Sequence, residues 1–166
     1  MKKLLLVLLM LAPVALFAQQ KFGVLNSTTI AQAMPEYTKA QTDLQTLQKQ
    51  YGDEYNRMRE EFAKKYEDYG KAKDSLPANI LQRREQELQD LQSRLEEYQQ
   101  DSYQRLQEAQ AQKMDEVKKK LTDAIQAVGT EGGYLCIFDK SGGVAYISDA
   151  QCEDVTAKVK TKLGIK

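Results

Sequence analysis

Apolar residues recur at helical spacing over a long stretch of the chain, from about residue 36 to residue 128. This stretch contains a single proline and only two glycines. In its first half the apolar positions are separated by steps of three and four residues, at Leu44, Leu47, Tyr51, Tyr55, Met58, Phe62, Tyr66 and Tyr69. Such spacing places these side chains on one face of an α-helix, and its eleven-residue repeat keeps that face nearly straight.

The second half of the stretch has the same periodicity, at Leu81, Leu88, Leu91, Leu95, Tyr98, Leu106, Ala109, Val117, Leu121, Ala124 and Val128. Between the halves, Pro77 cannot continue a helix but suits the first turn of a new one. A short connection of this kind makes the two helices antiparallel neighbours. We therefore predict a helical hairpin over residues 36–128, with its tip near residues 73–77.

Short strand patterns precede and follow the hairpin. Residues 22–26 form one predicted strand, and the candidate helix caps Ser27, Thr28 and Thr29 precede a short helix that Pro35 interrupts. After the second long helix, residues 134–138 and 144–148 have the pattern of a β-hairpin. Ser148 or Asp149 is then expected to cap a closing helix that carries Val155, Val159 and Leu163 on one face.

These flanking segments, residues 19–35 and 129–166, predict a small module beside a mainly α-helical, α+β chain. About 50 residues bury too little surface for a convincing core, and a three-stranded sheet has open edges. Closing several copies into a barrel would remove those edges, so we expect an oligomer. The residues expected in this oligomerisation body are Phe22, Val24, Tyr134, Ile137, Phe138, Val144, Tyr146, Val155 and Val159.

Residues 1–18 have the pattern of a cleavable signal peptide. Lys2 and Lys3 precede an apolar run, and Ala18 offers a small residue before the cut. A membrane anchor is the alternative, but the run is too short to span a bilayer comfortably. Cleavage removes both lysines and leaves 22 basic against 24 acidic residues, so we expect an exported, nearly neutral chain without a membrane span.

The composition argues against catalysis. The chain has no histidine and therefore lacks the commonest general base and metal ligand. It also has no phosphate-binding glycine loop, nucleophile elbow or paired-cysteine metal spacing, so we predict no enzyme, metal or cofactor. The balanced charges do not form a nucleic-acid footprint. They alternate as acid–base pairs four residues apart, typical of a solvated helix face: Asp53/Arg57, Glu60/Lys64, Glu61/Lys65, Glu67/Lys71, Asp90/Arg94, Asp101/Arg105, Asp115/Lys119 and Glu116/Lys120.

Two sets of residues leave alternatives open. The large side chains of the hairpin either fill the contact between its helices or offer amphipathic contact to another chain. The candidates for the second role are Tyr51, Tyr55, Phe62, Tyr66, Tyr69, Leu76, Tyr98 and Tyr103. Cys136 and Cys152 could form a disulfide in an oxidising compartment, or remain two separate buried thiols.

The order of elements, and several local sequences, resemble the Skp/OmpH family of periplasmic chaperones. The matching segments are 21–26, 34–37, 134–139 and 144–146, and the closing stretch from Asp154 to Gly164. The resemblance implies a jellyfish-like trimer in the periplasm, with coiled-coil arms around a cavity. It further implies an ATP-independent holdase that binds unfolded outer-membrane β-barrel proteins. A competing hypothesis is an envelope scaffold or spacer that binds one defined partner.

Overall fold

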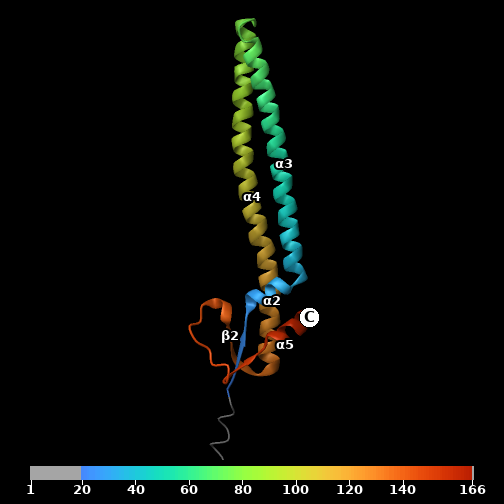
Figure 1. The fold of residues 1–166 in the computed structure, drawn as a ribbon, viewed down its shortest axis with the longest axis vertical. Helices are drawn as coiled ribbons and strands as arrows, with labels where there is room; N and C mark the ends of the chain where they lie inside the picture. The colour runs from blue at the N-terminus through green and yellow to red at the C-terminus, as the bar shows by residue number, and fades with distance from the viewer. Residues whose placement is uncertain (1–19, 166) are drawn as a thin grey trace, which may run out of the picture. The chain divides into compact units, whose positions relative to one another are not determined.

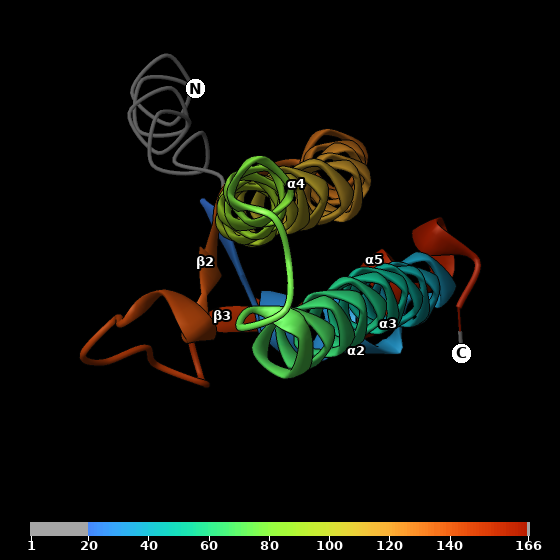
Figure 2. The same ribbon diagram turned by 90° about the horizontal axis from the view of Figure 1, so that it is seen from above.

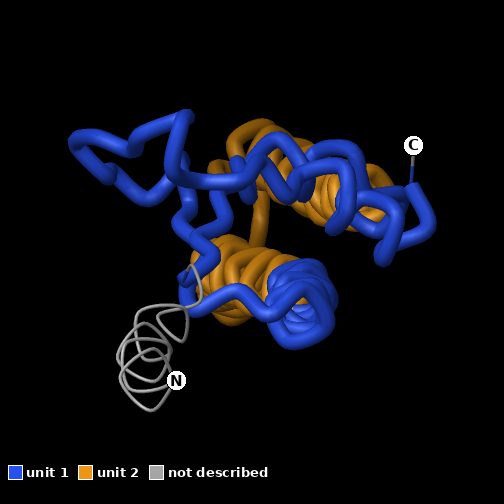
Figure 3. Tube along the Cα trace, turned by 90° about the horizontal axis from the view of Figure 1, so that it is seen from below, with its two compact units in different colours: residues 1–37, 116–166 blue, residues 38–115 orange. Residues whose placement is uncertain are grey.

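The computed structural model describes residues 20–165, so the predicted signal peptide at 1–18 lies outside the described residues. Two compact units make up the chain (Figure 3). We call residues 20–37 and 116–165 the body unit, and residues 38–115 the hairpin unit. The elements are β1 (Lys21–Leu25), α2 (Ser27–Ala33), α3 (Pro35–Ala72), α4 (Ala78–Gly132), β2 (Tyr134–Asp139), η2 (Lys140–Gly142), β3 (Cys152–Asp154) and α5 (Thr156–Leu163) (Figure 1).

The hairpin unit consists of most of α3 and the first two thirds of α4, which lie side by side and run antiparallel (Figure 2). The apolar stripe predicted for the first helix is half-buried, except at Tyr66, which is exposed. Tyr51 and Tyr98 meet edge to face across the seam, with ring centroids 6.3 Å apart. Within residues 38–115 only Ala40 is fully buried, so this unit has a seam rather than a core.

Charged side chains support the two long helices, although mostly not in the predicted pairs. Of the eight pairs four residues apart, Glu67/Lys71 and Asp101/Arg105 form. Other basic side chains pair with an acid one turn away on the same helix or with an acid on the opposite helix. The observed alternatives are Lys49–Asp53, Arg57–Glu54, Lys119–Asp123, Lys65–Glu87, Lys113–Asp43 and Lys120–Glu36.

The body unit contains a three-stranded sheet in the order β2-β1-β3, and both outer strands run parallel to β1. The predicted β-hairpin of 134–138 with 144–148 is therefore wrong in its second half. Asp139 accepts a hydrogen bond from the Ser141 amide and starts a 3₁₀ turn instead of a tight hairpin turn. The chain then reaches β3 through residues 140–151, a crossover of the length that parallel strands require.

The hydrophobic core lies in the body unit, on one side of the sheet. Residues from β1, α2, the last third of α4 and α5 contribute to it: Leu25, Ile30, Met34, Val117, Leu121, Ala124, Val128, Val155 and Val159. The predicted face of the closing helix is confirmed, because Val155 and Val159 are fully buried and Leu163 packs against the core. This core holds β1 in place between the two outer strands.

Two helix starts differ from the prediction. Asn26, not Ser27, Thr28 or Thr29, caps α2 by accepting a hydrogen bond from the Thr29 amide. Ser27 is unavailable as a cap because its amide and hydroxyl both donate to Asp139. The closing helix begins at Thr156, well after Ser148 and Asp149, because β3 occupies the intervening residues. At this end the Asp154 carboxylate accepts from the Thr156 amide.

Candidate functional site

The aromatic residues proposed for contact with another chain fall into two groups in the hairpin unit. Most of them lie half-buried in the seam: Tyr51, Tyr55, Phe62, Tyr69 and Tyr98. Tyr66 and Tyr103 point away from it and are 60% and 66% exposed. Leu76 lies in the turn between the helices and is half-buried. The unit thus offers two exposed tyrosine rings and the rims of several others. The exposed ring of Tyr66 stacks on Phe62, with ring centroids 6.0 Å apart.

Hydrogen bonds and charge define the polar surroundings of these rings. Tyr69 donates its hydroxyl to the Glu85 carboxylate at 2.6 Å, and this bond raises the pKa of Tyr69. The Lys65 ammonium holds the pKa of Glu87 below its usual value. Residues 38–115 carry 13 basic and 16 acidic side chains, a net charge of −3. The surface therefore combines exposed aromatic rings with mixed, slightly acidic charge.

The predicted oligomerisation residues lie on both faces of the sheet. Val155 and Val159 lie in the core, and Ile137 packs against it. Phe22 and Phe138 lie on the other face, where their rings stack with centroids 6.1 Å apart. Alternation along β1 places the buried Val24 on this face as well.

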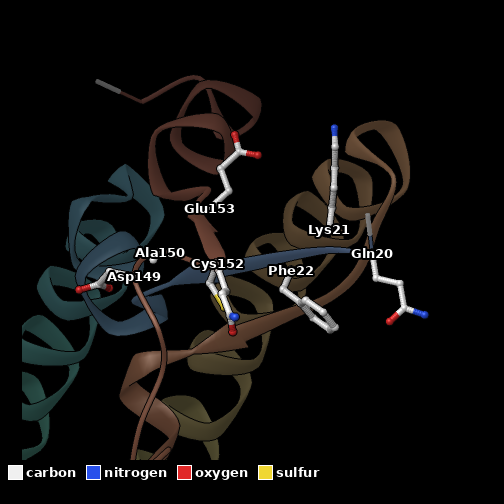
Figure 4. A pocket seen from close by; sticks show the side chains of 8 residues that line it. Gln20, Lys21, Phe22, Asp149, Ala150, Cys152 and Glu153 are labelled. Atoms are coloured by element: carbon white, nitrogen blue, oxygen red, sulfur yellow. The ribbon is translucent and has the colours of Figure 1, made fainter. Parts of the chain in front are cut away.

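An apolar groove follows the face that carries Phe22 and Phe138. Its volume is about 280 Å³. Val144 and Tyr146, in the crossover between β2 and β3, line it and are 44% and 82% exposed. A neighbouring cavity of about 760 Å³ begins at Phe22 and Cys152 (Figure 4). The groove is thus apolar, whereas the neighbouring cavity is lined mainly by polar side chains: Gln20, Lys21, Asp149, Gln151 and Glu153.

A polar cluster fastens the sheet to α5. Tyr134 donates its hydroxyl to Glu153 at 2.6 Å, and the Lys158 ammonium donates to both residues and lies 5.4 Å from the centre of the Tyr134 ring. The bond from Lys158, followed by that from Tyr134, lowers the pKa of Glu153. Gly132 lies against the same ring, where a Cβ would overlap its edge. The cluster links the start of β2 to β3 and α5 across the central strand β1.

A second cluster fixes the far end of β2. The Asp139 carboxylate accepts hydrogen bonds from the amides and hydroxyls of both Ser27 and Ser141. Partial burial alone would raise the pKa of Asp139, but the four bonds outweigh it and hold the pKa below its usual value. This carboxylate links β2 to the start of α2.

Leu135 is a surface residue that sequence reasoning missed. The register of β2 shifts between the partners of Lys21 and Phe22, so Leu135 is an extra, bulged residue. Its side chain is 63% exposed on an edge strand. Residues 134–138 are an uninterrupted apolar run, in which no change of alternation can mark an extra residue, so no signal in the sequence indicated the bulge.

The two thiols are separate rather than bridged. The expectation of two separate thiols is confirmed. The expectation that both are buried is wrong, because Cys136 is exposed and Cys152 is half-buried. Among residues 20–165 no group of three side chains could hold a metal ion. Within the same range, no helix is sufficiently long and apolar to cross a membrane.

Comparison with known proteins identifies the family of this chain. The sequence profile of the family described as "Outer membrane protein (OmpH-like)" matches residues 21–163, nearly the whole described chain. The chain belongs to the OmpH-like family. It is therefore a member of a family of periplasmic chaperones, which are not enzymes.

The fold agrees with that assignment. A crystal structure described as an OmpH-like outer membrane chaperone from Caulobacter crescentus superposes with a TM-score of 0.76. The match covers 88% of this chain and 85% of that one, at 16% sequence identity, so it shows the shared fold alone. No curated protein is significantly similar to this chain in sequence.

Proposed function

We propose that this OmpH-like chain is an ATP-independent holdase, which binds unfolded outer-membrane β-barrel proteins and prevents their aggregation before membrane assembly. The observation that carries the proposal is the hairpin unit, which exposes Tyr66 and Tyr103 and has a half-buried seam in place of a core. Such amphipathic rings give weak contacts to many apolar sequences. Affinity then comes from several contacts made at once.

The active form in this proposal is a trimer of exported chains in the periplasm. The sheet supports an oligomer, because β2 and β3 are both edge strands with one unpaired side. The face with Phe22 and Phe138 offers an apolar groove lined by the exposed Val144 and Tyr146, and Leu135 is exposed on the edge strand β2. A second and third copy would cover these apolar side chains and pair the open edges. The threefold symmetry itself rests on the family resemblance.

The test is suppression of aggregation. A urea-unfolded outer-membrane β-barrel protein is diluted into buffer with and without the mature chain, and light scattering is followed without nucleotide. We expect scattering to fall and to saturate near one client per oligomer. An unrelated soluble coiled coil is the control, and suppression no greater than in this control would contradict the holdase.

The scaffold hypothesis gives a different result in the same assay. A spacer that binds one defined partner would leave the scattering of unfolded β-barrel proteins unchanged. It would also bind its partner at a saturable site that does not depend on the exposed tyrosines. The present surface favours the holdase, because the two exposed rings of Tyr66 and Tyr103 lie on separate helices.

A further inference from the structure

The proposed function makes no use of the two cysteines, yet the sheet aligns them. Cys136 on β2 and Cys152 on β3 are both in register with Phe22 on β1. Neighbouring strands lie about 4.8 Å apart, so the Cα atoms of the two cysteines are roughly 10 Å apart. A disulfide needs a Cα separation below about 7 Å. Because β1 stands between them, the fold prevents a disulfide within one chain.

Both thiols lie on the open face of the sheet. Residues in register on parallel strands point to the same face, which here is the face of Phe22 and its groove. Figure 4 shows Phe22 and Cys152 directed to one side of β1 and β3, and Lys21 and Glu153 to the other. Cys136 is exposed and Cys152 half-buried, so the thiols are accessible from outside the chain.

We propose that Cys136 of one copy forms a disulfide with Cys152 of the next copy, so that the ring of copies becomes covalently closed. The proposal rests on the oligomer of the proposed function. Both thiols lie at the level of Phe22 on the two edges of one sheet, so a ring whose copies are only slightly staggered along the strands would bring Cys136 of one copy beside Cys152 of the next. The two cysteines lie on opposite edge strands, and a head-to-tail contact brings unlike edges together.

The chemistry is ordinary thiol–disulfide exchange with a disulfide-bearing oxidant of the export compartment. The exposed Cys136 thiolate attacks a sulfur of the oxidant and forms a mixed disulfide, and the oxidant releases its first thiol. Cys152 of the neighbouring copy then attacks the Cys136 sulfur and releases the second thiol. Each link forms one S–S bond from two S–H groups, and the two electrons and two protons reduce the oxidant's disulfide.

The test is covalent linkage of the mature chain in oxidised glutathione, followed on denaturing gels without reductant. We expect linked dimers and a closed ring in the wild type, both lost with dithiothreitol. Cys136→Ser alone and Cys152→Ser alone should each stay monomeric on the gel. After the two variants are unfolded in urea and refolded together, a linked dimer should appear, because each supplies the thiol that the other lacks.

Three results would overturn the disulfide: a wild type that is never linked, a refolded mixture without dimers, or single variants that link as strongly as their mixture. The background control is Ser93→Cys in a chain with both cysteines replaced by serine, since Ser93 is an exposed position on α4. Linkage in the wild type no greater than in this control would also contradict the proposal.

Sedimentation of the chain with both cysteines replaced separates this proposal from the proposed function. If this variant is an oligomer and suppresses aggregation while the wild type never links, only the disulfide is wrong. If every form sediments as a monomer, the oligomer and the disulfide are both wrong.

Discussion

The body unit and the hairpin unit contain the same kinds of residue but use them differently. The body unit buries nine apolar side chains in one cluster, whereas the hairpin unit fully buries only Ala40. In the hairpin unit the charged side chains form isolated ion pairs. In the body unit, hydrogen bonds join polar groups into two clusters, around Asp139 and around Tyr134. Native stability therefore resides mainly in the body unit, and the hairpin unit is free to expose aromatic surface.

The two units also differ in net charge. The described body residues carry eight basic and eight acidic side chains, and the hairpin unit has a net charge of −3. A neutral body favours association between copies, while a charged hairpin keeps exposed rings in solution. The comparison suggests a division of labour in which one unit assembles and the other binds, and each prediction below tests one part of it.

The largest difference in stability between the units should appear when an apolar side chain is truncated in each of them. Ile30→Ala removes a fully buried side chain from the body core and should lower the free energy of unfolding by about 2–5 kcal/mol. Leu91→Ala, at a half-buried seam position, should cost roughly 1 kcal/mol, because only part of its surface leaves water on folding. Urea denaturation followed by circular dichroism measures both. Equal losses would show that the seam is as important to stability as the core.

Replacing a glycine by alanine should lower the stability in the body unit and raise it in the hairpin unit. Gly132→Ala would place a methyl group in the edge of the Tyr134 ring and should destabilise the chain by about 1–3 kcal/mol. Gly52→Ala meets no atom within 4 Å in the middle of α3 and should stabilise it by about 0.5–1 kcal/mol. Thermal unfolding midpoints give the two signs. A neutral Gly132→Ala would mean that the Tyr134 ring can move aside without cost.

The Asp139 cluster gives stability that depends on pH. The folded pKa of Asp139 is lowered, so its contribution is fully present above the usual value of 3.8 and is lost as the pH falls through the folded pKa. At neutral pH Asp139→Asn should cost about 1–2 kcal/mol, because one acceptor oxygen is lost. Below pH 3.8 the difference between the two chains should shrink, and it should disappear once the pH is below the lowered folded pKa of Asp139, since protonated aspartate resembles asparagine.

The control for this substitution is Asp101→Asn in the hairpin unit, where the carboxylate pairs only with Arg105 at the surface. We expect a smaller effect there, because exposed ion pairs contribute little. Urea denaturation at a series of pH values measures all three chains. A constant difference between Asp139→Asn and the wild type down to acid pH would show that the carboxylate charge is not what stabilises the end of β2.

Local periodicity was sufficient to predict the hairpin unit from the sequence. Its contacts join neighbouring turns and two adjacent helices, so the three-and-four spacing and Pro77 defined both helices and the turn. The body unit depends on pairings between distant residues. Ser27 and Asp139 are 112 residues apart, and no local pattern indicates that the Ser27 amide and hydroxyl would donate to Asp139.

The candidate site was also predicted only in part from the sequence. Periodicity identified the aromatic residues, but Tyr66 belongs to the apolar stripe in sequence and is exposed in the structure. The strand β3 was missed because three residues, one of them apolar, are too short for an alternation signal. Residues 144–148 have strand-like sequence, yet they have no regular pairing in a single chain. Strand propensity alone does not supply a partner.

The smallest expected effect concerns exposed tyrosines, which occur in both units. Tyr66→Ser with Tyr103→Ser should weaken the binding of an unfolded β-barrel client roughly three- to tenfold, as expected for the loss of two aromatic contacts. It should lower the unfolding midpoint only slightly, because neither ring is buried and the stacking of Tyr66 on Phe62 is the only aromatic pair that it removes among the described residues. Tyr146→Ser removes an even more exposed ring from the body unit and should leave client binding unchanged while weakening association between copies. Fluorescence anisotropy of a labelled client and sedimentation velocity of the chain measure the two effects. If Tyr146→Ser weakened client binding as much as the double substitution, the binding surface would extend over both units, and the division of labour between them would be wrong.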